Sequence, residues 1–221
     1  MRQSLRNSCV FCLSLISILP GSAQPIANEE AKQLPPITVR IYNFARVSGK
    51  TLIEAESEAA RILRETELEI TWLDCSPNLP DRPECQQPVG PVELSLRIIP
   101  KMFGSTKSKF QSTDLGFAPP DKEGGVMATI FYDRVERTAR GGKISRILGN
   151  AIAHEFGHLL LGADAHSKEG MMRAHWDREQ LKLATEGQLQ FSREQSDLMH
   201  ANISSRLNRL GRRSRLVATS E

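Results

Sequence analysis

The chain has 221 residues, of which 29 are lysine or arginine and 26 are aspartate or glutamate, so its formal net charge is +3. Two of the basic residues, Arg2 and Arg6, lie near the N-terminus, and the rest of the chain is close to neutral. This balance excludes strong attraction to polyanions, so no specific nucleic-acid partner is expected. The length suits a single domain with a sizeable core.

Residues 1–23 have the three parts of a secretory signal peptide. A basic part holds Arg2 and Arg6, residues 9–19 are apolar, and Gly21-Ser22-Ala23 forms a cleavage site of small residues. The apolar part is shorter than the ~20 residues that a transmembrane helix needs, and no later segment is long and apolar enough. We expect cleavage, a secreted or periplasmic protein and no stable membrane insertion. Retention of the segment as an uncleaved anchor is the alternative.

A proline-containing linker, residues 24–36, leads into the first regular elements. Residues 37–44 alternate apolar and polar side chains and are rich in β-formers, which predicts a strand. In residues 51–68 the apolar side chains recur at helical spacing, which predicts an amphipathic helix. Residues 69–73 and 92–99 are predicted to be strands.

Two cysteines remain once the signal segment, with Cys9 and Cys12, is removed. Cys75 and Cys85 flank a short loop that is rich in proline and aspartate. In an exported protein we expect them to form a disulfide bond. A role for these two cysteines as metal ligands is the alternative.

A polar, glycine- and proline-rich loop, residues 101–125, separates these strands from the second half of the chain. Residues 126–135 then predict a fourth strand. Residues 144–161 have helical periodicity, and Gly162 follows them as a left-handed residue that would end the helix. Two further helices are predicted at residues 178–186 and 193–210.

The C-terminal stretch is locally basic and is predicted to be a solvated helix end. Five arginines lie in it: Arg206, Arg209, Arg212, Arg213 and Arg215. The prediction for the whole chain is one domain, residues 37–210, followed by a basic flexible tail, residues 211–221. The element order predicts an α/β (α+β) fold, a mixed twisted sheet of about four strands packed by two helices, with further helices at the C-terminus.

The run His154-Glu155-Phe156-Gly157-His158 carries the chemistry of this sequence. In a helix, His154 and His158 lie one turn apart on one face, so both imidazoles can bind one metal ion. Glu155 lies beside them and can act as a general base. This pattern is typical of zinc-dependent hydrolases, which hold one zinc ion with three protein ligands and leave one position open.

The motif and its continuation resemble the metzincins, zinc endopeptidases with the signature H-E-x-x-H-x-x-G-x-x-H and a methionine turn beneath the metal. In this chain the glycine, Gly162, comes one residue later than in the signature, and the next histidine, His166, comes two residues later. Two residues are therefore candidates for the third metal ligand. His166 is favoured because imidazole is the commoner zinc ligand, and Asp164, at the position given by the family spacing, is the alternative. A downstream glutamate is a further option.

The resemblance also suggests roles for segments around the motif. Met172, or its neighbour Met171, would form the methionine turn, and residues 126–135 would be an edge strand that pairs with an extended substrate. The loop of residues 101–125 could form a rim or lid. His175 and Trp176 follow the methionine pair. A surface or packed position is favoured for His175, a position near the substrate pocket is the alternative, and His200 receives no role.

Taken together, the sequence predicts an exported zinc metallo-endopeptidase with one zinc ion per chain and protein or peptide substrates. Zinc would activate a water molecule, and Glu155 would accept its proton as the water attacks a peptide carbonyl. Two alternatives use the same residues. One is a zinc amidase that acts on cell-wall material, and the other is a catalytically inactive binding protein with the same fold.

Overall fold

The computed structural model describes residues 34–80, 82–102, 114–119, 125–140, 142–162 and 165–218. The predicted signal peptide therefore lies outside the described residues, as does most of the predicted linker. Within the described part of the chain, no helix is both long and apolar enough to cross a membrane.

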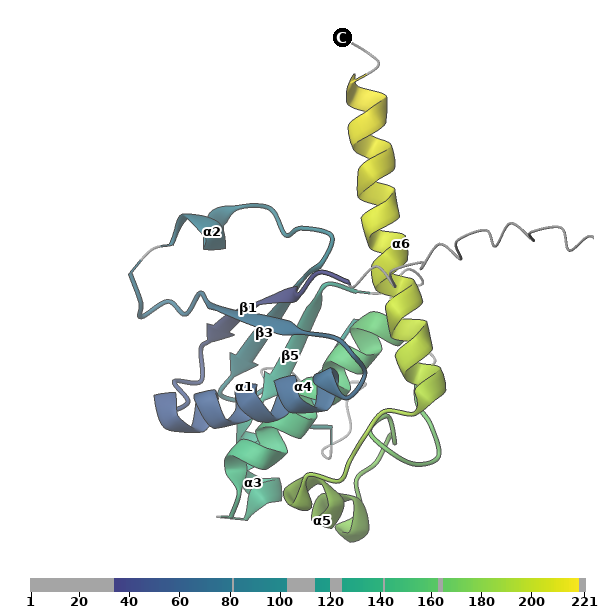
Figure 1. Cartoon of the computed structure of the whole chain (residues 1–221). Coiled ribbons are helices and arrows are strands. Elements are labelled where there is room, and N and C mark those ends of the chain that lie inside the picture. Colours follow the sequence, from purple (N-terminus) through teal and green to yellow (C-terminus); the bar gives the residue numbers. More distant parts are fainter. Residues whose placement is uncertain are drawn as a thin grey trace, which may run out of the picture. The chain divides into compact units, whose positions relative to one another are not determined.

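The described elements form a mixed sheet with helices, as predicted (Figure 1). The strands are β1 (Ile37–Asn43), β2 (Ile70–Asp74), β3 (Glu93–Ile99), β4 (Gly116–Phe117) and β5 (Met127–Phe131). The helices are α1 (Gly49–Arg64), α2 (Pro83–Gln86), α3 (Tyr132–Ala139), α4 (Ile144–Leu161), α5 (Arg178–Glu186) and α6 (Arg193–Ala218).

The sheet has the order β2-β1-β3-β5-β4. Strands β2, β1, β3 and β5 run parallel, and β4 pairs antiparallel with β5 at the edge. Consecutive parallel strands need a crossover, and α1 provides the one between β1 and β2. The prediction of an α/β sheet is confirmed, with one more strand than the four expected.

Helices α1 and α4 cover one face of this sheet (Figure 1). Alternate residues of β1, β3 and β5 point toward these helices and are buried: Ile37, Val39, Ile41, Leu94, Leu96, Ile98, Ala128 and Ile130. The two helices approach closely at Gly149, where an added Cβ atom would lie 2.7 Å from the carbonyl oxygen of Ala55. The core therefore holds α4 tightly against both the sheet and α1.

The end of α1 differs from the prediction of a helix through residue 68. Glu67 adopts a left-handed conformation with φ 62°, and the amides of Glu67 and Leu68 donate to the carbonyls of Arg64 and Leu63. This pair of hydrogen bonds is a Schellman motif, which ends a helix. The sequence did not reveal it because the left-handed residue is a glutamate and not a glycine.

The predicted strand of residues 126–135 is wrong in its second half. Strand β5 ends at Phe131 and helix α3 begins at Tyr132. The prediction that this strand lies at the edge is also wrong, because β5 lies between β3 and β4. The strand at this edge of the sheet is β4, which sequence analysis treated as part of a loop. Two residues are too few to show the alternation that identifies a strand.

The predicted disulfide between Cys75 and Cys85 is present, and their Cα atoms are 5.7 Å apart. On the sheet face opposite the helices, Arg40 is buried and donates to the carbonyls of Gln87 and Pro88, just after the disulfide loop. It also forms an ion pair of 2.6 Å with Glu93.

At the C-terminus, α6 continues to Ala218 and does not end at the predicted residue 210. Most of the segment predicted as a flexible tail, residues 211–221, is therefore helical.

Candidate metal centre

The residues of the zinc motif lie on α4, which has the bounds that the sequence predicts. Gly162 ends this helix with φ 93°, and its amide donates to the carbonyl of His158. Such a conformation is rarely accessible to residues with a side chain, so a glycine suits this position. One face of α4 packs in the core, and this packing fixes the direction in which the histidines project.

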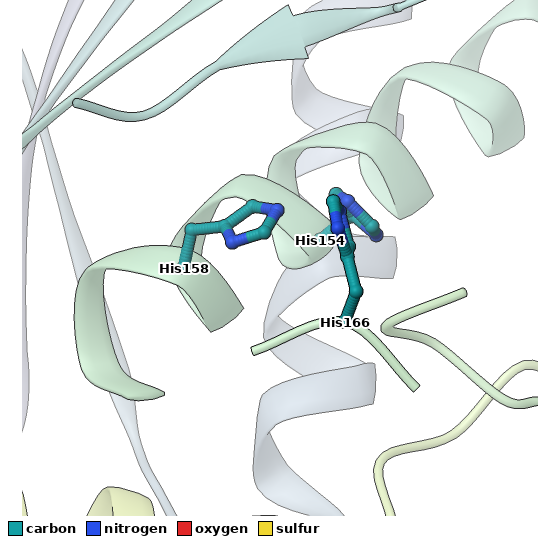
Figure 2. A group of neighbouring side chains, drawn as sticks. All are labelled: His154, His158 and His166. Atoms are coloured by element: carbon teal, nitrogen blue, oxygen red, sulfur yellow. The ribbon is translucent and has the colours of Figure 1, made fainter. Parts of the chain in front are cut away.

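The structure brings three histidines together (Figure 2). One ring nitrogen from each of His154, His158 and His166 can be chosen such that all three lie within 4.8 Å of one another. His154 and His158 project from α4, and His166 projects toward them from the segment that follows the helix. The ring centroids of His158 and His166 are 4.6 Å apart.

His166 is one of the three converging histidines, and Asp164 lies outside the described residues. The choice of His166 over Asp164 as the third ligand therefore stays a prediction.

The ring of His154 is held in one orientation by the main chain. Its Nδ1 atom is 2.8 Å from the carbonyl oxygen of Met171. A carbonyl can only accept, so Nδ1 carries the hydrogen and the lone pair of the neutral ring lies on Nε2. This contact fixes the tautomer, as the outer partners of metal-binding histidines commonly do.

All three histidines are held in their neutral form. Burial lowers the pKa of His154 to about 4 and that of His158 to about 3, and it also lowers the pKa of His166. Neutral imidazoles keep the lone pairs that a metal ion needs. Three converging neutral imidazoles form a donor set that suits zinc and leaves room for a further ligand.

Met172, the residue predicted for the methionine turn, lies directly against α4. Its side chain is fully buried, and a Cβ atom built onto Gly157 would lie only 2.2 Å from its Sδ atom. Gly157 therefore makes room for the thioether between the two helical histidines. The turn itself is closed by a hydrogen bond from the Ser167 amide to the Met172 carbonyl.

Glu155 is buried beside β4. The amide of Ala118, just after this strand, donates to its carboxylate. A Cβ atom built onto Gly116 would lie 2.7 Å from the Oε1 atom of Glu155, so the strand backbone and the carboxylate are in direct contact. Burial raises the pKa of Glu155 to about 8, with a further contribution from the charge of Asp114.

Sequence analysis missed both Gly116 and Asp114. Asp114 is close enough to influence the pKa values of His154, Glu155 and His166, and its carbonyl accepts a hydrogen bond of 2.6 Å from Arg134. Neither residue has a sequence signal, because both lie in a polar loop with no motif.

The remaining histidines divide between the site and the scaffold. Trp176 contacts the ring of His154 edge-on at 5.9 Å, and exposed His175 lies near enough to lower the pKa of His166. His200 lies on α6, where its Nε2 atom donates to the carbonyl of Thr66 at 2.6 Å. Sequence analysis favoured a surface or packed position for His175, which is exposed, and gave His200 no role.

Comparison with known proteins connects this geometry to a fold. No protein-family model matches the sequence, and no curated protein sequence matches it. Among solved structures, an archaemetzincin from Methanopyrus kandleri is similar, with a TM-score of 0.51 over 76% of this chain and 96% of that chain. The two sequences are 16% identical, so the similarity concerns the fold alone. The chain has a metzincin-like fold in which three histidines converge at α4.

Proposed function

We propose that this protein is an exported zinc-dependent metallo-endopeptidase. The observation that carries the proposal is the convergence of His154, His158 and His166 within 4.8 Å, next to the buried carboxylate of Glu155. The donor set fits zinc, because three neutral imidazoles provide lone pairs and the Nδ1 atom of His154 is already occupied by the Met171 carbonyl. One zinc ion per chain would be held by these three rings.

When bound, a zinc ion supplies a Lewis acid that polarises a substrate carbonyl and lowers the pKa of water. Glu155 accepts a proton from the attacking water and then transfers it to the leaving amine. Burial makes this carboxylate a stronger base than it is in solvent, and the Ala118 amide keeps it oriented. Proton transfer to an amine suits the hydrolysis of a peptide bond.

The edge strand β4 supports a peptide as the substrate. Within the described residues, β5 is the strand with which β4 pairs, so β4 lies at one edge of the sheet. An extended peptide can hydrogen-bond to such an edge. Since Gly116 in β4 contacts Glu155, a peptide bound along this strand would pass the general base.

Two features support export. Residues 1–23 have the pattern of a signal peptide, and the Cys75–Cys85 disulfide is typical of proteins in oxidising compartments. N-terminal sequencing of the protein recovered outside the cytoplasm should give Gln24 as the first residue, and recovery of the uncleaved chain with the cells would contradict this.

The decisive experiment is metal analysis of the purified protein together with an assay on casein. We expect about one zinc ion per chain, cleavage of casein, and loss of cleavage with retained zinc in Glu155→Gln. His166→Ala should lose zinc, whereas Asp164→Ala and the exposed control His175→Ala should keep it. A folded protein without zinc overturns the proposal, and activity on cell-wall fragments but not on casein would identify an amidase.

A further inference from the structure

Arg206 lies in the C-terminal stretch that sequence analysis predicted to be a solvated helix end. The structure places it on α6 with only 5% of its surface exposed. A buried guanidinium is costly unless hydrogen-bond acceptors surround it. Its neighbours along the helix, Arg209 and Arg212, are exposed, so Arg206 differs from the rest of the basic stretch.

The acceptors around Arg206 come from two other segments. Its Nη2 atom donates to the carbonyl of Leu159 at 2.8 Å and to the carbonyl of Gly125 at 3.0 Å. Its Nε atom donates to the Oδ1 atom of Asn202 on the same helix at 2.6 Å. One guanidinium therefore joins α6, the end of α4 and the segment before β5.

Both carbonyls lie next to the candidate metal centre. Leu159 follows His158 directly and belongs to the last turn of α4, whose carbonyls cannot all find partners within the helix. A cation at this end also interacts favourably with the helix dipole. Gly125 packs against the same turn, because a Cβ atom built onto it would lie 2.8 Å from Leu159 and 3.3 Å from the carbonyl of Pro119.

Gly125, through its close approach to the carbonyl of Pro119, also lies near the segment that contacts the proposed general base, Glu155. Pro119 follows Ala118, whose amide donates to Glu155. Arg206 thus binds Gly125 and the turn that follows His158, and Gly125 in turn lies beside the segment that orients Glu155.

We propose that Arg206 is a positioning residue for the metal centre. It fixes the last turn of α4 against the segments on either side of β4 and β5, and thereby sets the position of His158 relative to Glu155 and His166. The inference rests on the proposed function, and it makes α6 a required part of the site although α6 contributes no metal ligand. An arginine suits this role because its planar group can reach two carbonyls and Asn202 at once, which a lysine ammonium on its different stem does not reproduce.

The test compares zinc affinity in four full-length variants, measured by competition with a chelator, and the visible spectrum of the Co²⁺-loaded proteins. Arg206→Met should weaken zinc binding about 10-fold or more and change the Co²⁺ spectrum, and Arg206→Lys should restore part of the affinity. Arg212→Met removes a charge from an exposed position of the same helix and should behave as wild type. Leu207→Ala loosens the packing of α6 without removing the guanidinium and should keep the wild-type spectrum.

The possible outcomes separate this inference from the proposed function. Wild-type affinity and spectrum in Arg206→Met overturn the positioning role alone. Equal loss in Leu207→Ala also overturns it, since the effect would then come from the general stability of α6. A wild-type protein that binds no zinc overturns the proposed function, and the positioning role falls with it.

Discussion

The Nδ1 atom of His154 donates a 2.8 Å hydrogen bond to the main-chain carbonyl of Met171, seventeen positions further along the chain. This bond connects the active-site helix to the methionine turn. The carbonyl sets the tautomer of the histidine, and the next residue, Met172, packs against Gly157 on the same helix. The orientation of a metal-binding ring therefore depends on how well this turn fits under α4.

The fit at Gly157 gives the first prediction. Gly157→Ala should weaken zinc binding and destabilise the protein by about 1–3 kcal/mol, because the added methyl group would overlap the Sδ atom of Met172. The measurements are urea unfolding and zinc competition. Gly211→Ala, at a helical glycine where an added Cβ meets nothing within 4 Å, is the control and should leave both values unchanged or slightly improved. Equal behaviour of the two variants would contradict the packing described for Met172.

A second prediction concerns the contact between β4 and the general base. Gly116→Ala should lower kcat about 10- to 100-fold and leave zinc content unchanged, since the three atoms nearest to the new methyl group all belong to Glu155. Steady-state kinetics and metal analysis test this. Gly49→Ala, where an added Cβ has open space, serves as the control. Loss of zinc together with activity would show that the strand supports the ligands and not the base.

Metal removal gives the third prediction. If zinc is present at about 1,000 times its dissociation constant, it stabilises the folded protein by about 4 kcal/mol, so a chelator should lower the unfolding temperature by roughly 8–16 °C. The measurement is thermal unfolding with and without EDTA. His154→Ala should unfold at the same temperature in both conditions, because it lacks a ligand. An EDTA effect of the same size in that variant would place the metal elsewhere.

The fourth prediction is a pH dependence that arises outside the metal centre. Burial on α1, and then the charge of Asp74, raise the pKa of Glu56 from 4.5 to about 7. The folded protein therefore holds a proton between these pH values that the unfolded chain releases. The unfolding free energy should decrease as pH rises from about 4.5 to about 7 and then stay level.

Glu56→Gln removes the titrating group and with it this decrease in unfolding free energy, so the variant tests the predicted direction of the pH dependence. The variant should match the wild type at pH 4 and exceed its unfolding free energy by about 1–2 kcal/mol above pH 7, a value reduced for solvent screening of a partly exposed group. Urea unfolding of the metal-free proteins at several pH values measures the difference. In an Asp74→Asn background the difference should shrink. A difference that does not change with pH would contradict the shifted pKa.

Local patterns in the sequence were sufficient for the central parts of the site. Helix α4 has its predicted bounds because its apolar spacing and the glycine after it are both local signals. The positions of His154 and His158 on one face, with Glu155 beside them, follow from helix geometry alone. The Cys75–Cys85 bond also follows from the number of cysteines and the expected compartment.

Other features depend on contacts between distant segments. Strand β4 has two residues and exists through its pairing with β5, and its contact with Glu155 comes from the packing of α4 against the sheet. The fold also brings His166 to the two histidines of the helix. The sequence left this position open, because His166 comes two residues later than in the metzincin signature.

Periodicity and residue type act over a few neighbouring positions, so the helix, the residue types it carries and the kind of fold can be predicted from local patterns. Which arginine is buried depends on packing between distant segments. Arg206 and Arg212 look alike in the basic stretch, yet only Arg206 faces the carbonyls of Leu159 and Gly125. That difference arises because a buried charge must find acceptors, and those acceptors come from segments that are far away in the chain.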